Sequence, residues 1–286
     1  MAWEILDKAT TVAMLSFVVS SMLAMGTGLT VREILAALRN HRLIIVALLA
    51  NFVLMPLVAL ALAKLLWLDE PLGVGLLLLG CAAGAPFLPK LAQLSKGNLP
   101  FAVGAMVLLM IITVGYLPIV LPLLLPEVTV NPFKIAQSLI VLMLLPLGVG
   151  LLMNARWGGL SAHIKPYLDR LSSISLMLLI LLISIVNFDK VLQVFGRRGI
   201  LAAVLFIAFG SLLGWLIGGP KDDTRRVLAL GTGQRNIAAA LVVGSQSFTD
   251  QEVTVMVVVV AIIGLVTLMP LAGILGRSVP AEQLEA

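Results

Sequence analysis

Long apolar runs separated by short polar clusters dominate the amino-acid sequence. A helix of about 20 apolar residues crosses the hydrocarbon core of a bilayer, so each run without Asp, Glu, Lys or Arg is a candidate membrane span. Seven such runs cover residues 9–31, 43–63, 99–126, 135–155, 171–188, 199–220 and 253–276. Two further segments, 71–95 and 224–249, are apolar but interrupted. The pattern predicts an all-α integral membrane protein with nine transmembrane helices.

The composition points the same way. Of the 286 residues, 60% are hydrophobic and 12% are charged, whereas about 25% of the residues in a soluble domain are charged. We attribute the net charge of +5 to basic residues that flank membrane spans, because no basic face or aromatic platform for nucleic acid accompanies it. The predicted spans carry no histidine or carboxylate cluster for catalysis. We therefore expect a protein of the lipid bilayer that is not an enzyme and binds no nucleic acid.

The distribution of basic residues predicts the orientation of the chain. With nine spans, one side of the bundle carries Arg32, Arg39, Arg42, Lys96, Arg156, Lys165, Arg170, Lys221, Arg225, Arg226 and Arg277. The other side carries Lys8, Lys64, Lys134, Lys190, Arg197 and Arg198. The side richer in Lys and Arg is usually cytoplasmic. We therefore expect an outside N-terminus and a cytoplasmic C-terminus, in a multi-pass protein of a bacterial inner (plasma) membrane.

The two interrupted segments resemble each other. The sequences are "DEPLGVGLLLLGCAAGAPFLPKLAQLSKGN" and "DDTRRVLALGTGQRNIAAALVVGSQSFTD". Each opens with paired acids, breaks soon after a glycine (Gly80 or Gly231) and leads into a long uncharged span. The offset between them is an odd number of spans, so the second copy enters the membrane from the opposite side. The sequence thus predicts one transmembrane transporter domain, 1–286, with a first repeat at about 9–126 and an inverted second repeat at about 132–276.

The residues at the two breaks differ in kind. Pro89 interrupts the first segment, and Pro86 is suited to the first turn of the resumed helix. Gly231 and Gly233 are expected to loosen the backbone of the second segment. Unwound backbone at membrane depth is tolerated only where protein or a water-filled cavity surrounds it. We therefore predict that the two broken helices cross near the midplane and direct their ends at one small volume.

Four stretches carry a family resemblance: "AMGTGLTVREI" (24–34), "NFVLMPLVALALAKLL" (51–66), "CAAGAPFLPKLAQLSKGN" (81–98) and "GTGQRNIAAAL" (231–241). In this order they resemble the bile acid:sodium symporter family, and the resemblance extends over about 12–276. It implies two inverted repeats divided into panel and core domains, with two crossed broken helices in the core. It also implies alternating-access transport of a small organic anion, coupled to sodium. The chain is similar to the nine-helix form of the family.

The resemblance also shows where this chain departs from the family. Most side chains that bind sodium in the family are replaced here, at Phe87–Leu88 or Leu88–Pro89 and at Ala102, Met106, Gly231 and Arg235. The amide of Asn51 retains the ligand type, and the carbonyls of Thr232 and Gln234 could join it. The resemblance therefore implies a degenerate sodium site at Asn51, Thr232 and Gln234, and leaves sodium coupling open. Apart from this ion, no cofactor is expected.

The charged residue at each break is the main candidate for substrate binding. An ionised group at membrane depth is costly unless it faces a cavity or a partner. Arg235 replaces a sodium-binding glutamine of the family, so we hypothesise that its guanidinium stands in for the ion and offers a fixed positive charge to an anion. Lys90 is the predicted counterpart on the other break, where a desolvated lysine could also exchange a proton. Gln234, Asn236 and Pro86 complete the predicted substrate site.

Structural roles are open for the same residues. Arg235 could satisfy carbonyls freed by the break, and Lys90 could extend to the cytoplasmic interface. Gln234 and Asn236 could cap the broken helix, and Asn51 could link two helices.

The predicted function is a secondary active transporter of a small organic anion. The alternatives are a cation/proton antiporter-like or proton-coupled carrier, and a non-transporting sensor with the same fold. An antiporter needs acidic residues at the midplane, and the predicted spans contain no Asp or Glu.

Overall fold

The computed structural model describes residues 2–37, 40–125 and 131–278 of the chain. Over these residues the secondary structure is helical, without strands. Residue 126, at the end of the first predicted repeat, and Arg39, in the predicted cytoplasmic set, lie outside the described residues. The first part of the chain forms α1 (Ala2–Thr27), α2 (Val31–Ala37), α3 (His41–Leu49), α4 (Met55–Leu65), α5 (Glu70–Cys81), α6 (Leu88–Leu94) and α7 (Leu99–Leu124). The second part forms α8 (Pro132–Leu139), α9 (Leu145–Arg156), α10 (Gly158–Val186), α11 (Phe188–Gly196), α12 (Gly199–Ile217), α13 (Asp222–Gly233), α14 (Ile237–Ser247) and α15 (Gln251–Arg277).

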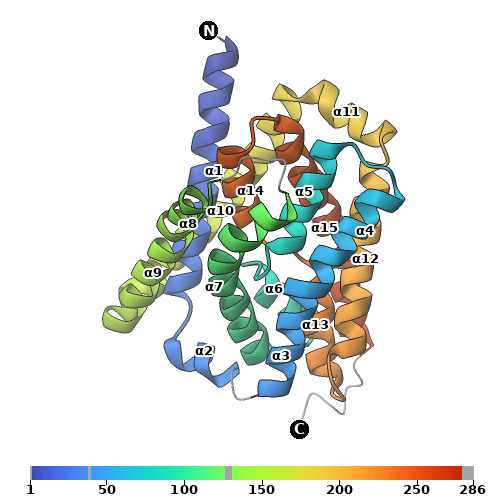
Figure 1. The fold of residues 1–286 in the computed structure, drawn as a ribbon. Helices are drawn as coiled ribbons and strands as arrows, with labels where there is room; N and C mark the ends of the chain where they lie inside the picture. The colour runs from blue at the N-terminus through green and yellow to red at the C-terminus, as the bar shows by residue number, and fades with distance from the viewer. Residues whose placement is uncertain (1, 38–39, 126–130, 279–286) are drawn as a thin grey trace.

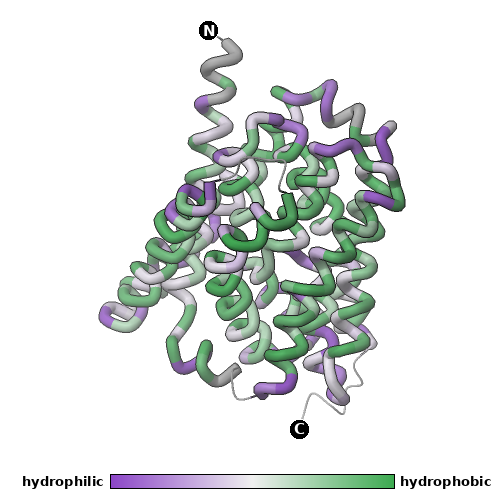
Figure 2. The backbone as a smooth tube through the Cα atoms, viewed as in Figure 1, coloured by the Kyte–Doolittle hydropathy of each residue, from purple (hydrophilic) through white to green (hydrophobic). Residues whose placement is uncertain are grey.

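Eight helical stretches of the described residues are long and apolar enough to cross a membrane. They are Lys8–Thr27, His41–Leu65, Leu99–Leu124, Pro132–Arg156, Gly158–Val186, Gly199–Ile217, Asp222–Ser247 and Gln251–Arg277. In Figure 2, hydrophobic segments cover the sides of the bundle and hydrophilic segments gather at its two ends. Large apolar side chains such as Leu57, Ile119 and Leu216 are exposed on these sides, as expected where lipid replaces water. The prediction of an all-α, multi-pass membrane protein is confirmed.

The predicted span 71–95 consists of two short helices, α5 and α6, joined by residues 82–87. Pro89, rather than Pro86, lies in the first turn of α6, which begins at Leu88. A proline fits there because the first N–H groups of a helix have no acceptor within it. The expectation that Pro86 starts the resumed helix is therefore wrong: Pro86 lies in the turn before it.

The glycines before the second break have a packing role instead of the loosening role expected from the sequence. Gly231 and Gly233 are both helical, within α13. A Cβ atom at Gly231 would lie 2.9 Å from Cδ2 of Leu88, and one at Gly233 would lie 2.2 Å from Oγ of Ser211. The two glycines thus allow α6 and α12 to approach α13 closely, and the helix ends only after them.

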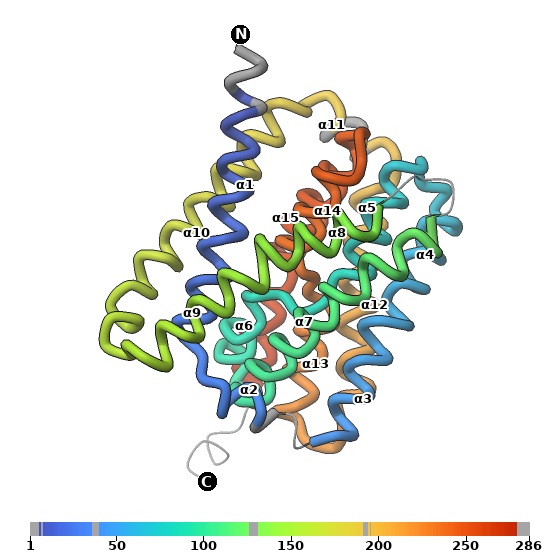
Figure 3. The backbone as a smooth tube through the Cα atoms, turned by 60° about the vertical axis from the view of Figure 1, so that its left-hand side comes forward, coloured from blue at the N-terminus to red at the C-terminus, as the bar shows by residue number. Residues whose placement is uncertain are grey.

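The helices form two groups. One contains α1, α9 and α10, in which α1 packs on both of the others. A Cβ at Gly26 of α1 would lie 2.3 Å from the Leu147 carbonyl oxygen, so the absence of a side chain lets α1 approach α9. The other group contains α4–α7 and α12–α15. Figure 3 shows α1, α9 and α10 along one side of the bundle.

The two ends of the bundle are distinguished by short helices. Figure 1 shows α11 at the end from which α1 projects, and α2 at the opposite end.

Two helices contain a wide π-type turn just before a proline. The first, η1 (Ala50–Leu54), joins α3 to α4 and precedes Pro56. The second, η2 (Ile140–Leu144), joins α8 to α9. A π turn changes which carbonyls receive an N–H, and such turns often occur at functional sites. In η1 this change affects the carbonyl of Asn51.

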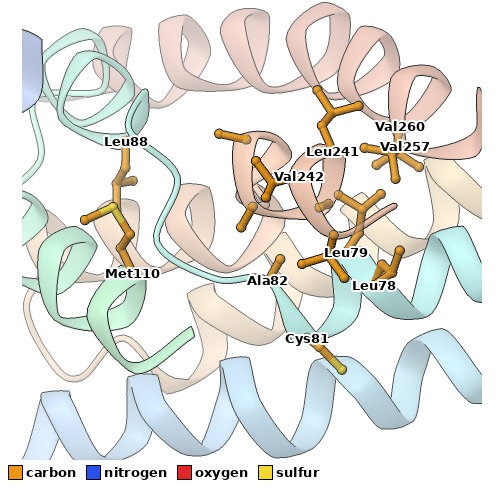
Figure 4. Packing of buried hydrophobic residues seen from close by; sticks show 14 of the residues in the cluster. Leu78, Leu79, Cys81, Ala82, Leu88, Met110, Leu241, Val242, Val257 and Val260 are labelled. Carbon is orange, nitrogen blue, oxygen red and sulfur yellow. The ribbon is translucent and has the colours of Figure 1, made fainter. Parts of the chain in front are cut away.

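The core surrounds the helix breaks. Figure 4 shows Leu88 of α6 beside Met110 of α7, and Leu241 of α14 near Val257 of α15. All four side chains are buried. The unwound segments thus lie inside protein, where their polar groups need partners from the chain itself.

Candidate functional site

The first break is held by hydrogen bonds from a neighbouring helix. The hydroxyl of Thr113, on α7, accepts from the Ala83 N–H at 3.0 Å and donates to the Ala83 carbonyl at 3.1 Å. Gly84 has a φ of +79°, and a Cβ there would lie 2.2 Å from the Met110 backbone nitrogen. Only glycine adopts this conformation at such a short distance from another backbone without strain. The break is therefore a fixed structure rather than a loosened helix.

The second break is short and ends in a capped helix. Asn236 is the N-cap of α14, and its side-chain oxygen accepts from the Ala239 N–H at 3.1 Å. This bond satisfies one of the free N–H groups at the start of a helix. The backbone N–H of Gln234 still donates to the Leu230 carbonyl, at the end of α13. Asn236 thus caps the resumed helix, which is one of the two roles that the sequence left open for it.

The two breaks contact each other through Asn236. Its backbone N–H donates to the Ala82 carbonyl at 2.9 Å. Its side-chain amide nitrogen donates to the carbonyls of Gly84 at 3.1 Å and Ala83 at 3.3 Å. Asn236 is fully buried. Its bonds join two segments that are more than 150 residues apart in the sequence.

Arg235 turns its guanidinium into the protein. Its side chain is almost entirely buried, with 2% of the residue exposed. Nε donates to the Leu79 carbonyl at 2.7 Å, and Nη2 donates to the Gly80 carbonyl at 2.6 Å. Nη1 donates to Oδ1 of Asn51 at 2.6 Å and to the Thr232 carbonyl at 3.5 Å. Nη2 also donates to the Asn51 carbonyl at 3.4 Å.

These oxygens are available because three helices leave them without their usual donors. Leu79 and Gly80 belong to the last turn of α5, which ends at Cys81. The Gly80 carbonyl therefore lacks a helical partner, and the Leu79 carbonyl keeps only a tighter bond, from the Ala82 N–H at 3.1 Å. In η1 the N–H of Met55 donates to Ala50 rather than to Asn51, which frees the Asn51 carbonyl. The C-terminal end of α5 also carries partial negative charge that favours a cation.

The predicted sodium site does not fit this arrangement. Asn51 and Thr232 are fully buried, and the amide nitrogen of Asn51 contacts Oγ1 of Thr232 at 3.4 Å. The Asn51 and Thr232 oxygens that would hold an ion already accept hydrogen bonds from Arg235. A sodium ion beside a guanidinium would be repelled by it in this poorly screened interior. The residues present therefore suit the arginine and not a free cation next to it.

Lys90 has the opposite environment. It is exposed, and its Nζ lies 5.4 Å from the centroid of the Phe87 ring, within the range of a cation–π contact. It forms no ion pair with a carboxylate of the described residues. The positive charge at the first break is therefore accessible, whereas the one at the second break is enclosed.

A cavity of about 860 Å³ lies beside both breaks. From the predicted substrate site it includes Pro86, Lys90, Gln234 and Arg235, but not Asn236. Gln234 is partly buried, and its Oε1 has no hydrogen-bond partner among the described residues. Gln234 and Lys90 therefore have polar groups that a ligand can use.

The walls of the cavity are mostly apolar, and its charged residues lie towards one end. The apolar part includes Phe17, Met25, Leu176, Val260, Leu265 and Leu268. The charged part includes Glu33 of α2 and the pair Lys165–Asp169 of α10, whose side chains are 2.6 Å apart. The cavity therefore extends towards the end of the bundle that carries α2.

Comparison with known proteins identifies the family. A model of the sodium bile acid symporter family matches residues 14–194. The chain belongs to this family. The prediction of a transporter rather than an enzyme is thereby confirmed.

Relatives in this family come from plants, animals and bacteria. The chain is 27% identical over 244 residues to the probable sodium/metabolite cotransporter BASS2 of Oryza sativa subsp. japonica chloroplasts, covering 82% of this chain and 57% of that protein. It is 22% identical over 260 residues to the hepatic sodium/bile acid cotransporter of Rattus norvegicus, and the match covers 86% of this chain and 71% of that protein. It is 26% identical over 226 residues to the uncharacterized sodium-dependent transporter YocS of Bacillus subtilis (strain 168), and the match covers 77% of this chain and 70% of that protein. The chain thus spans less than two thirds of the rice relative's length.

Two residues of α7, one bonded to the first break and one to the π turn η1, were not predicted from the sequence of this family member. Thr113 binds the first break, and Tyr116 donates its hydroxyl proton to the Phe52 carbonyl at 2.5 Å. That carbonyl is freed because Pro56, four residues later, has no N–H. Both residues are isolated polar side chains in the apolar run 99–126, which is the only signal that could have marked them.

Proposed function

We propose that this chain is a secondary active transporter of a small organic anion that works by alternating access. The observation that carries the proposal is the cavity beside both helix breaks, with apolar walls and an accessible Lys90. The names of its relatives, which refer to sodium/metabolite and sodium/bile acid cotransport, support an organic substrate. An anion needs a positive group or strong donors once water is removed from around it.

The substrate site consists of Lys90, Gln234 and Pro86. Lys90 provides the charge, and the Gln234 amide provides a hydrogen-bond donor once its side chain presents nitrogen to the ligand. Pro86 forms part of the wall beside them. The apolar remainder of the cavity favours an anion with an apolar body over a small, fully polar one.

Arg235 lies at the wall of the cavity but contributes to this site only through its charge. Its donors are used by chain oxygens, so it adds to the positive potential of the cavity without binding the substrate directly.

The transport cycle moves the α1–α9–α10 group, as the panel, relative to the remaining helices, as the core. At the α11 end the groups are in contact, because Ser245 of α14 contacts Met14 of α1 at 3.3 Å. At the α2 end the cavity separates them. In the proposed topology α5 and α6 together form a ninth span, the two repeats are inverted, and the α2 end is cytoplasmic in a bacterial inner membrane. This conformation is then open to the inside.

Uptake by the purified chain in liposomes tests the proposal. The probes are labelled taurocholate and phenylpyruvate, both with apolar bodies, and succinate as a polar anion. We expect saturable uptake of at least one of the first two, and a fall of roughly tenfold or more in kcat/KM for Lys90→Gln. Lys96→Gln, an exposed lysine outside the cavity, is the matched control and should transport normally.

Three outcomes contradict the proposal. They are no flux of either apolar-bodied probe, saturable binding without flux, and uptake that Lys90→Gln and Lys96→Gln reduce equally.

A further inference from the structure

The environment of Arg235 has the composition of a cation-binding cage. A guanidinium has five N–H donors, and five hydrogen bonds join this one to oxygens of Leu79, Gly80, Asn51 and Thr232. All the acceptors are neutral carbonyl or amide oxygens. Arg235 forms no ion pair with a carboxylate of the described residues. The cation is therefore stabilised by oriented dipoles, as an ion is when carbonyls replace its hydration shell.

The cage is built by the backbone and does not depend on Arg235 for its oxygens. The end of α5 exposes two carbonyls, the π turn η1 exposes a third, and the end of α13 supplies the fourth. Residues 82–87 are fixed separately by Thr113 and Asn236. Removing the arginine side chain therefore leaves oxygens that are close together and buried, and only the Leu79 carbonyl keeps a backbone donor, the Ala82 N–H. This is unfavourable unless a cation replaces the guanidinium.

We propose that Arg235 is a covalently attached cation that permanently fills this cage, so the chain needs no free cation there, and that vacating the cage creates a binding site for a free monovalent cation. The cage follows from the geometry alone. The consequence for transport, that the anion is carried without sodium in this cage, rests on the proposed function.

An arginine that fills a cation cage differs in one observable from an arginine with a purely structural role. A structural arginine that only fills space would leave a defect that no ion repairs. A cage would accept a small cation of suitable shape from solution, guanidinium above all, because its planar donors match the same oxygens.

The experiment uses the purified full-length chain in detergent, with the thermal unfolding midpoint as the readout. Arg235→Ala is heated in choline chloride, and again with low-millimolar to 50 mM guanidinium chloride or sodium chloride at constant ionic strength. Binding to the folded state alone should raise the midpoint saturably, by about 3 °C or more with guanidinium. The wild-type chain should show no such rise, because its cage is filled.

Arg226→Ala is the matched control. Arg226 is on the same helix, α13, and is also buried, at 5% exposed. Its guanidinium makes one bond, from Nη1 to the Lys96 carbonyl at 3.5 Å, and its Nε has no partner. We expect this variant to be insensitive to guanidinium. If Arg235→Ala does not fold, Arg235→Gln keeps an amide in the site and should gain stability from sodium or guanidinium.

Equal responses of the Arg235 and Arg226 variants to each cation would overturn the proposal, as would a wild-type chain stabilised by guanidinium. No transport is measured, so failure of this test is distinct from failure of anion uptake.

Discussion

The two helix breaks each carry a cation but use it in opposite ways. At the break between α5 and α6, Lys90 is exposed beside the cavity, and its Nζ lies 5.4 Å from the centroid of the Phe87 ring. At the break between α13 and α14, Arg235 is 2% exposed and donates to oxygens from three helices. The first break is instead stabilised by a threonine from α7 and a glycine with positive φ.

Membrane depth alone therefore does not show that a charge binds a ligand. The number of hydrogen-bond acceptors that the chain offers to a cation decides whether that cation is free to bind a ligand. Arg235 has as many acceptors as a guanidinium has donors, whereas Lys90 has none of the described carboxylates as an ion-pair partner. The donors of the arginine are thus used by the protein, and Lys90 is the charge that we propose for the substrate.

Replacing the arginine of one break by lysine, and the lysine of the other by arginine, should give the largest difference in the free energy of unfolding. An ammonium has three donors in a compact head and does not span the oxygens that a planar guanidinium reaches. Arg235→Lys leaves about two buried oxygens without partners and should lower the free energy of unfolding by about 4 kcal/mol. Lys90→Arg keeps an exposed charge and should change it by less than about 0.5 kcal/mol. Thermal unfolding midpoints of the two variants give the comparison, and similar losses would contradict it.

Added methyl groups should distinguish the two breaks next. Gly84→Ala combines a positive φ with a Cβ overlapping the Met110 backbone, at a cost of about 3 kcal/mol. Gly233→Ala meets the Ser211 hydroxyl first, and that side chain can rotate, so about 1 kcal/mol is expected. The same unfolding measurement applies. If Gly233→Ala lowered the free energy of unfolding more than Gly84→Ala does, the backbone of the first break would not be what holds it in place.

A smaller effect is expected at Thr113. Thr113→Val keeps the shape of the side chain but leaves the Ala83 N–H and carbonyl without their hydroxyl partner, which should cost about 2 kcal/mol. Thr267→Val is the control, because its hydroxyl bonds to a carbonyl of its own helix and its loss should cost about 0.5 kcal/mol. Equal unfolding midpoints would remove Thr113 from the account of the first break.

The sequence predicts the apolar spans and the places of both breaks because length and charge are local properties. It leaves open whether Arg235 binds a substrate or satisfies freed carbonyls, since the answer depends on the positions of oxygens of Asn51, Leu79 and Gly80. The role of Thr113 is hidden for the same reason, because its partner Ala83 is 30 residues away. The packing role of Gly231 depends on the position of Leu88, which periodicity does not reveal.

The ion dependence of uptake shows whether Arg235 takes the place of a coupled sodium ion. Wild-type chain is reconstituted in liposomes, and initial rates of phenylpyruvate and taurocholate uptake are measured with sodium and with choline on both sides. If Arg235 supplies the cation, the rate should change by less than about twofold when sodium is removed. A fall of roughly tenfold or more, typical of a coupled ligand, would show that a free sodium ion is still required and would contradict the account.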